Sequence, residues 1–231
     1  IRNGIDTSVW NPATDTHIAQ RFTSDDLSGR DACRTELAEI AGWAADNTPI
    51  VGMVSRLVEQ KGIDLVLDSL RFLPTLPARL IVLGAGAAEL AGSLAAAGEH
   101  APTHVWFFDG YDEALGHRIF AGSDLFLMPS RFEPCGLAQM QAMAYGSIPV
   151  VTDVGGLRDT VVDADRDRSD GLGFTSLTVD TAGLVDALHR GVRAVRHAGR
   201  RRAIQTRAMT EDWSWAAPAA RHLEVYADIA R

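Results

Sequence analysis

Two cations stand where a strand-like stretch of the sequence gives way to a helix-like one. Arg56 and Lys61 lie five residues apart in the segment 55–62 (SRLVEQKG), between an apolar run over Ile50–Ser55 and a helical pattern over Ile63–Leu73. Backbone amides at the N-terminus of such a helix attract anions, and two full positive charges strengthen that attraction. The segment therefore predicts a site for a diphosphate group. The alternative is that both cations are ordinary surface charges.

A carboxylate is the second candidate for chemistry. Glu133 precedes Pro134 and Gly136 in the stretch 129–139 (PSRFEPCGLAQ), at the expected start of a helix over Leu137–Tyr145. The proline stiffens the turn, and the glycine lets free helix amides meet a substrate. A carboxylate there can hydrogen-bond sugar hydroxyls or stabilise positive charge on an anomeric carbon. The structural alternative is an acidic side chain favoured by the helix dipole.

Three further loops could approach a ligand. Gly84 and Gly86 permit a close backbone approach, although a tight strand–helix turn would explain them equally well. Tyr111 offers a ring that could stack on a nucleobase, or that could simply pack at the rim of the domain. Gly155 and Gly156 open another helix in a form suited to backbone contact with a ligand.

The elements that would position these residues alternate in type. Short apolar runs, rich in Val, Ile, Leu or Phe on both faces, are separated by stretches of helical periodicity. This pattern predicts a doubly wound parallel sheet, in which ligands bind at the carboxyl ends of the strands where the strand order reverses. The expected strands are Ile50–Ser55, Arg79–Leu83, His104–Phe108, Asp124–Met128 and Ile148–Thr152, with a short sixth strand at Gly171–Phe174. The expected helices are Cys33–Ala41, Ile63–Leu73, Ala87–Ala97, Glu113–Ala121 and Leu137–Tyr145.

The two ends of the chain differ from this middle part. Residues 1–48 are irregular in pattern, and Thr181–Arg231 shows a helical pattern with a break near Trp213–Pro218. We therefore expect a doubly wound α/β body at 49–212, a linker and N-terminal extension at 1–48, and a helical C-terminal tail at 213–231.

Composition limits the classes of protein to consider. The chain has 231 residues, of which 46% are hydrophobic, and its formal net charge of -8 argues against general affinity for nucleic acid. Cys33 and Cys135 lack CxxC partners, so we expect neither zinc nor a disulfide, and a cytoplasmic location. No apolar run is long enough to span a bilayer, so no membrane partner is expected. The chain begins at Ile1 rather than Met, which favours a fragment of a longer protein.

Taken together, the loops resemble the C-terminal domain of bacterial glycogen synthases and plant starch synthases. The matching stretches follow one another in the right order along most of the chain, and the run at 130–137 is the most specific. They are residues 3–6 (NGID), 10–12 (WNP), 54–57 (VSRL), 60–62 (QKG), 83–86 (LGAG), 110–113 (GYDE), 117–119 (HRI), 129–137 (PSRFEPCGL), 155–157 (GGL) and 159–161 (DTV).

The resemblance implies a function and a role for each residue. It implies a two-domain glycosyltransferase of the GT-B fold, which transfers glucose from ADP-glucose, with retention, to the non-reducing end of an α-1,4-glucan and needs no divalent metal or other cofactor. By this resemblance Arg56 and Lys61 neutralise the diphosphate of ADP and Tyr111 lies against adenine. Glucose is then held by Glu133 and the backbone around Cys135, Gly136 and Leu137.

Some features depart from the family pattern or leave alternatives open. Ala138 stands where the family usually has Thr or Asn, and Gln141 stands where related transferases with other donors often have a second Glu. The glucan-binding N-terminal domain of the family, with its Lys-x-Gly-Gly-Leu motif, is not among these residues, so we expect the fragment to bind ADP but scarcely to catalyse. The alternatives are a retaining transferase that uses UDP-glucose and a non-catalytic module that binds nucleotide or glucan. A dehydrogenase is disfavoured because no G-x-G-x-x-G follows the first strand.

Overall fold

A parallel sheet forms the centre of the computed structural model, which describes residues 1–72 and 75–230. Its strands follow the order β3-β2-β1-β4-β5-β6, and every neighbouring pair is parallel. The order reverses between β1 and β4, which pair through Val51–Leu125 and Gly52–Phe126. The strands are β1 Ile50–Val54, β2 Arg79–Gly84, β3 Val105–Asp109, β4 Leu125–Met128, β5 Ile148–Thr152 and β6 Phe174–Ser176.

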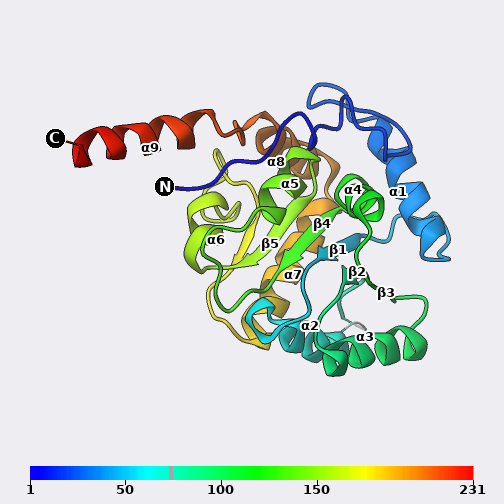
Figure 1. The fold of residues 1–231 in the computed structure, drawn as a ribbon. Helices are drawn as coiled ribbons and strands as arrows, with labels where there is room; N and C mark the ends of the chain where they lie inside the picture. Colours follow the sequence, from blue (N-terminus) through cyan, green and yellow to red (C-terminus); the bar gives the residue numbers. More distant parts are fainter. Residues whose placement is uncertain (73–74, 231) are drawn as a thin grey trace.

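Helices cover both faces of this sheet (Figure 1). Successive strand residues point to opposite faces, so Ile50 joins the cluster under α1, α4 and α5, whereas Val51 joins the cluster over α2, α3 and α7. The predicted doubly wound fold is thereby confirmed. The α-helices are α1 Gly29–Ile40, α2 Ile63–Ser69, α3 Ala88–His100, α4 Glu113–Gly122, α5 Ala138–Ala144, α6 Gly155–Thr160, α7 Thr181–Val195, α8 Ala198–Thr210 and α9 Ala216–Ile229, and the short 3₁₀ helices are η1 Glu59–Lys61 and η2 Leu70–Phe72.

Several boundaries differ from the prediction. The sixth strand begins at Phe174, because Leu172 and Gly173 donate instead to the carbonyl of Val162 in the preceding loop. The expected helix over Ile63–Leu73 changes to a 3₁₀ turn after Ser69, and its expected last residue, Leu73, lies outside the described residues.

The C-terminal third contains one more interruption than the sequence indicated. Between α7 and α8, the His197 side chain accepts a hydrogen bond from the Arg200 backbone amide and so starts a new helix. The expected break near Trp213–Pro218 is present, but Pro218 lies in the first turn of α9, where a proline is tolerated. The expected last helical residue, Arg231, lies outside the described residues.

The N-terminal extension packs onto the body of the domain. Ile5, Phe22 and Leu27 are buried in the cluster formed with α1, α4 and α5. The Ile5 amide also donates to the carbonyl of Trp213 at 2.8 Å, which places the N-terminal segment beside the segment that precedes α9 (Figure 1). The boundaries expected at 48/49 and 212/213 stay predictions.

A buried polar cluster fastens this extension to α4 and to the end of α5. Asp15 accepts hydrogen bonds from Tyr145 Oη at 2.5 Å and from His117 Nδ1 at 2.6 Å. Trp10 stacks on the His117 ring with centroids 4.1 Å apart. Burial alone would raise the Asp15 pKa, but the hydrogen bonds from Tyr145, the His17 amide and His117 outweigh burial and lower the pKa.

The last helix, α9, projects from the body (Figure 1). If the tail from Trp213 onward braces a further domain, as the family resemblance implies, Trp213, Trp215 and Tyr226 would be partly exposed, and core packing is the alternative. The alternative holds for Trp213, which is buried in the core and donates from Nε1 to the Ala208 carbonyl. Trp215 and Tyr226 are exposed, as expected. No helix in the described part of the chain has the length and apolar character needed to cross a membrane.

Candidate functional site

The loops that follow β1 and β4 meet at the point where the strand order reverses. Gln60 in the first loop joins them, because its carbonyl accepts from the Arg131 amide at 2.8 Å and its side-chain amide donates to the Phe132 carbonyl at 2.8 Å. Since ligands of doubly wound sheets bind beyond the carboxyl ends of strands at such a reversal, this crevice is the candidate site.

Gly62 lets the first loop lie this close to the second. Its φ is 68°, in the left-handed region, and a side chain on it would collide with the backbone carbonyl of Pro129. The residue ends the 3₁₀ turn Glu59–Lys61 and starts α2, so the chain turns sharply just after Lys61. A glycine here is therefore required by the backbone conformation and by the neighbouring loop.

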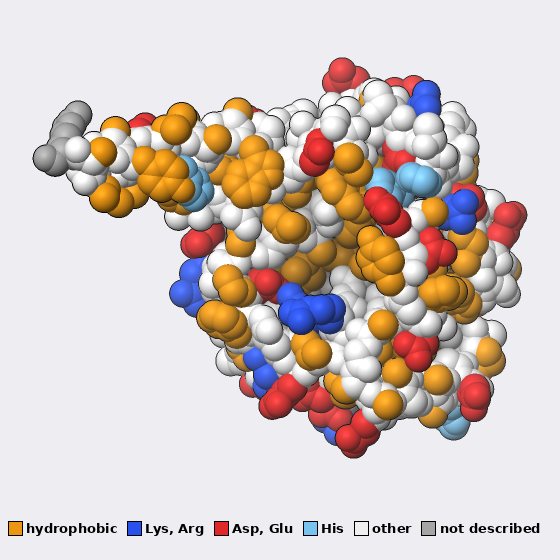
Figure 2. All heavy atoms as spheres, viewed as in Figure 1, with side chains coloured by type: hydrophobic (Ala, Val, Ile, Leu, Met, Phe, Trp, Pro, Cys, Tyr) orange, Lys and Arg blue, Asp and Glu red, His pale blue; other side chains and the backbone are white. Residues whose placement is uncertain are grey.

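Three predicted site residues line one cavity. Arg56, Lys61 and Glu133 all contribute to a cavity of about 210 Å³ between the ends of β1 and β4 and the start of α5. Gly136 and Leu137, predicted to contact the sugar, line the same cavity. Figure 2 shows that this face of the molecule is hollowed near its centre, with Lys and Arg side chains at the edge of the hollow.

Lys61 and Glu133 form an ion pair inside this cavity. Nζ of Lys61 lies 2.5 Å from Oε2 of Glu133, and the two side chains are only 17% and 7% exposed. Ser130 adds a second hydrogen bond, from Oγ to the same carboxylate oxygen at 3.1 Å. The carboxylate is thus oriented by two donors rather than left on the surface as a simple helix-end charge.

Arg56 is the exposed cation of the site. No ion pair joins its guanidinium to another residue in the described part of the chain, although the side chain lines the cavity. The charged lining of Arg56, Lys61 and Glu133 therefore has one net positive charge, and Arg56 provides the donors that are not already engaged. An anion would find both Coulomb attraction and unoccupied N–H groups there.

Gln139 holds the loop between Glu133 and α5 in place, a role that the sequence did not reveal. Its buried side-chain amide donates to the carbonyls of Cys135 and Gly136 at 3.0 and 3.1 Å and to Thr160 Oγ1 at 3.1 Å. Helix α5 begins only at Ala138, one residue later than expected, after the left-handed Gly136. Such a buried polar side chain with three carbonyl or hydroxyl partners cannot be distinguished from a surface glutamine by composition alone.

The side chain of Cys135 faces the N-terminal extension. Its Sγ accepts a hydrogen bond from the Asn3 amide at 3.2 Å, and Cys135 is not among the residues that line the cavity. The predicted sugar contact through the Cys135 backbone stays a prediction. The same hydrogen bond places the segment around Asn3 next to the loop that holds Glu133 and Gly136.

Gly155 and Gly156 support the loop from behind. A side chain on Gly155, whose φ is 42°, would collide with the Glu133 carbonyl, and one on Gly156 would collide with the Cys135 backbone. The Gly156 amide donates to the Glu133 carbonyl at 2.9 Å. Neither glycine lines the cavity, so their predicted contact with a substrate stays a prediction.

Tyr111 lies outside the cavity lining, in the loop after β3. The residue is 85% exposed, so its side chain is available to a ligand that extends along the carboxyl edge of the sheet. Its predicted contact with adenine stays a prediction. Within residues 1–72 and 75–230, no three or more His, Cys, Asp or Glu side chains are grouped to hold a metal ion.

Comparisons of sequence and of structure both find glycosyltransferases that are similar to this chain. The family model for glycosyl transferases group 1 matches residues 38–208. A glycogen synthase of Halorhodospira halophila is 46% identical over 229 residues, which cover 99% of this chain and 48% of that protein. A glycogen synthase of Alkalilimnicola ehrlichii is also 46% identical, over 98% of this chain and 48% of that protein.

Solved structures extend the comparison. The catalytic domain of starch synthase IV from Arabidopsis thaliana, bound to ADP and acarbose, is 36% identical with a TM-score of 0.93, over 99% of this chain and 48% of that one. A sucrose-phosphate synthase from Thermosynechococcus elongatus, at 20% identity and a TM-score of 0.68, covers 98% of this chain and 51% of that one and shares the fold. The chain spans about half the length of the curated relatives it matches.

Proposed function

The chain belongs to the glycosyl transferases of group 1, and on that premise we propose that it is the donor-binding half of an ADP-glucose-dependent glycogen or starch synthase. Its sheet is the Rossmann-like half of the GT-B glycosyltransferase fold. The complete enzyme would transfer glucose from ADP-glucose, with retention, to the non-reducing end of an α-1,4-glucan. The glycogen synthases at 46% identity and the ADP-bound starch synthase support this choice.

The observation on which the proposal depends most is the single cavity shared by Arg56, Lys61 and Glu133. When the bond from glucose to the diphosphate breaks, negative charge collects on the leaving diphosphate and positive charge on the anomeric carbon. Arg56 and Lys61 would stabilise the first charge, because fixed cations act strongly where water is partly excluded. Their two charges would compensate the leaving group without a metal ion.

Glu133 would act on the sugar. Its carboxylate, oriented by Lys61 and Ser130, would accept hydrogen bonds from glucose hydroxyls and stabilise positive charge at the anomeric carbon. Diphosphate binding would draw part of the Lys61 interaction away from Glu133, so the carboxylate would be more available to the sugar when the donor is bound. Backbone amides near Gly136 and Leu137 would complete the sugar contacts.

The acceptor glucan would bind in the other half of the protein. The relatives are about twice as long as this chain, and the exposed apolar side chains of α9 would pack against that other half. Transfer needs the donor and acceptor held in one geometry, so the chain alone would bind ADP or ADP-glucose and turn over slowly. The cytoplasm, where the thiols of Cys33 and Cys135 would stay reduced, is the proposed location.

Competition between nucleotide sugars tests the proposal. ADP-glucose and UDP-glucose are each titrated into the chain by calorimetry, and each is then displaced by the other. We expect saturable binding of both with a clear preference for ADP-glucose. Preference for UDP-glucose would favour a transferase of another donor class, and absence of binding by either would contradict the donor site itself.

A further inference from the structure

A cluster of arginines lies outside the donor site. Residues 187–210, which span most of α7 and all of α8, contain seven arginines and neither Asp nor Glu, in a chain whose formal net charge is -8. None of them lines the cavity that holds Arg56, Lys61 and Glu133. The proposed function therefore gives this positive charge no role.

Part of this cluster forms a second concave site. A cavity of about 350 Å³ lies between α8 and the loop that precedes β6. Its polar lining consists of Arg168 from that loop, His197 from the turn before α8, and Arg200 and Arg207 from α8, and the rest of its lining is Ala and Ile. This volume falls within the range of small-molecule sites.

The three guanidinium groups retain unused donors. Arg168 is exposed and has no hydrogen bond or ion pair to the described part of the chain. Arg207 uses Nε and Nη2 on the Gly171 carbonyl, at 3.1 and 2.8 Å, which leaves Nη1. Arg200 uses only Nη2, on Asp165 Oδ1 at 2.5 Å and the Ala164 carbonyl at 3.3 Å, which leaves Nε and Nη1.

His197 adds one more donor. Its Nδ1 accepts the Arg200 backbone amide at 3.3 Å, so the proton of the neutral ring is on Nε2. The same contact caps α8, whose positive N-terminal end therefore begins beside the cavity. All four polar side chains of the lining are thus donors, and none of them is a carboxylate.

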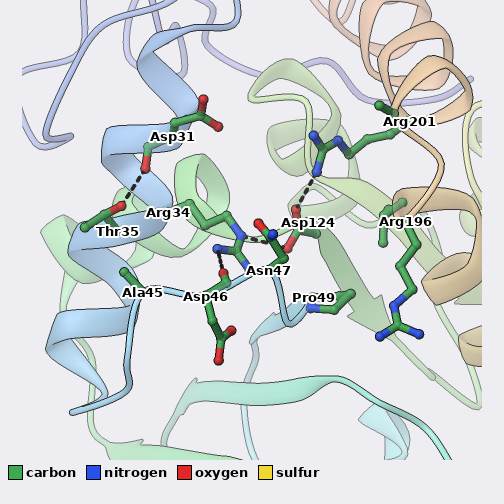
Figure 3. Close-up of a pocket in the computed structure, with 12 residues that line it drawn as sticks. Asp31, Arg34, Thr35, Ala45, Asp46, Asn47, Pro49, Asp124, Arg196 and Arg201 are labelled. Atoms are coloured by element: carbon green, nitrogen blue, oxygen red, sulfur yellow. Dashed lines mark hydrogen bonds and ion pairs between the residues drawn. The ribbon is translucent and has the colours of Figure 1, made fainter.

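A larger cavity, lined in part by Ala198 and Arg201 of α8, provides a contrast. Its volume is about 770 Å³, and two of its arginines, Arg34 and Arg201, point toward Asp124 (Figure 3). Arg34 lies 3.2 Å and Arg201 3.8 Å from the nearly buried carboxylate of Asp124. The lining of that cavity contains three Asp and three Arg side chains, so its charges balance. The lining of the cavity at Arg168 contains three Arg side chains and no Asp or Glu.

We propose that the cavity lined by Arg168, His197, Arg200 and Arg207 binds the phosphate group of a small anion. A phosphate offers several acceptor oxygens to donors that converge from a loop and a helix, and guanidinium groups match its geometry. Two carboxylates near the cavity lie outside its lining: Asp165 is already paired with both Arg190 and Arg200, and Asp167 accepts hydrogen bonds from the Ser169 and Asp170 amides. The proposal does not depend on the proposed function, because the two cavities share no residue.

Amide chemical shifts in the ¹⁵N-labelled chain test this proposal site by site. Inorganic phosphate and glycerol 3-phosphate are titrated separately at constant ionic strength. Gly199 and Ala203 report on the arginine cavity, and Gly62 reports on the donor cavity. We expect saturable shifts at Gly199 and Ala203. Tighter binding of glycerol 3-phosphate would identify a phosphorylated metabolite as the ligand, and equal binding would identify the phosphate ion.

Two variants decide whether the arginine cavity is responsible. Arg168→Ala removes a side chain without described partners, and we expect it to weaken phosphate binding at Gly199 and Ala203 on the order of tenfold. Arg193→Ala removes the same charge from an exposed position of α7 outside the cavity, and we expect no change. The absence of saturable shifts, or equal affinity in Arg168→Ala and the wild type, would overturn the proposal.

Discussion

At the scale of single residues, the ion pair between Lys61 and Glu133 determines the charge that a donor molecule meets. The pair neutralises Lys61, and Arg56 supplies the remaining positive charge at the cavity. Removing the carboxylate therefore has opposite effects on the two parts of a nucleotide sugar. It should release Lys61 for the diphosphate and remove a ligand of the sugar.

Glu133→Gln separates these two effects. We expect the affinity of the chain for ADP, which has no glucose, to stay equal or to rise by up to about tenfold, because one negative charge near the diphosphate disappears. In the complete transferase proposed above, the same change should slow glucose transfer by about a hundredfold or more. Calorimetry with ADP measures the first effect, with Glu99→Gln on the exposed surface of α3 as the control. Weaker ADP binding in Glu133→Gln would contradict the assigned division of roles.

At the scale of elements, the contact between the loops after β1 and β4 depends on Gly62. An alanine at φ 68° costs about 1–2 kcal/mol from its backbone conformation alone, and its methyl group would also displace the Pro129 carbonyl. We expect Gly62→Ala to lower the free energy of unfolding by about 2 kcal/mol or more and to weaken ADP binding, because Lys61 moves with its loop.

Gly92→Ala is the matched control. Gly92 lies inside α3, and a side chain on it would meet open space. Alanine has the higher helix propensity, so we expect this variant to gain about 0.5–1 kcal/mol in free energy of unfolding. Urea denaturation measures both variants, and equal stability of the two would refute the role given to Gly62.

The polar cluster that fastens the N-terminal extension predicts a dependence on pH. The Asp15 pKa lies below its ordinary value of 3.8 in the folded chain. Its contribution to stability is therefore complete above that value and is lost as the pH falls through the lower folded pKa. We expect Asp15→Asn to destabilise the chain at pH 7, and the difference from the wild type to narrow below about pH 4. Urea unfolding midpoints of the wild type and Asp15→Asn between pH 3 and 7 measure this stability difference. A stability difference that does not change with pH would argue against a charged Asp15.

At the scale of the whole molecule, α9 contributes little to the body of the domain. Among its described residues only Pro218 is buried, whereas Leu223, Tyr226 and Ile229 are each more than half exposed. Figure 2 shows hydrophobic side chains along the helix that extends away from the body. The apolar surface of α9 is thus available to the other half of the protein proposed above.

Truncation after Trp215 tests whether the body of the domain folds and binds ADP without α9. We expect the shortened chain to keep its free energy of unfolding within about 1 kcal/mol and to keep its affinity for ADP, because little apolar area leaves the core. Binding of an apolar dye should fall, since the exposed hydrophobic side chains of α9 are lost. A truncated chain that fails to fold would show that α9 supports the body directly.

The sequence predicted the sheet and most of its strands, because residues such as Ile50 and Val51 are apolar on both faces of a covered strand. It also indicated Arg56, Lys61 and Glu133, since each follows a strand at the carboxyl edge. It could not predict that Lys61 pairs with Glu133 across 72 positions, or that the buried amide of Gln139 holds the loop. Such contacts depend on tertiary placement, which local patterns do not encode.

The same limit explains what the sequence left open or misplaced at the C-terminal end. Leu172 is apolar and buried, as in a strand, but its amide pairs with the carbonyl of Val162 in a loop. The residues around Trp213 in the sequence do not determine whether its side chain is exposed or packed against the N-terminal extension. Its burial follows from Ile5 and its neighbours, which are distant in sequence.

The central claim is that Arg56 and Lys61 bind the diphosphate of the donor together. Calorimetric titration of ADP into the wild type, Arg56→Ala, Lys61→Ala and the surface control Arg193→Ala tests it most directly. The account predicts that each of the first two variants binds ADP about ten- to a hundredfold more weakly, as expected for the loss of one charge-assisted hydrogen bond, while the control is unchanged. Wild-type affinity for ADP in both Arg56→Ala and Lys61→Ala would contradict it.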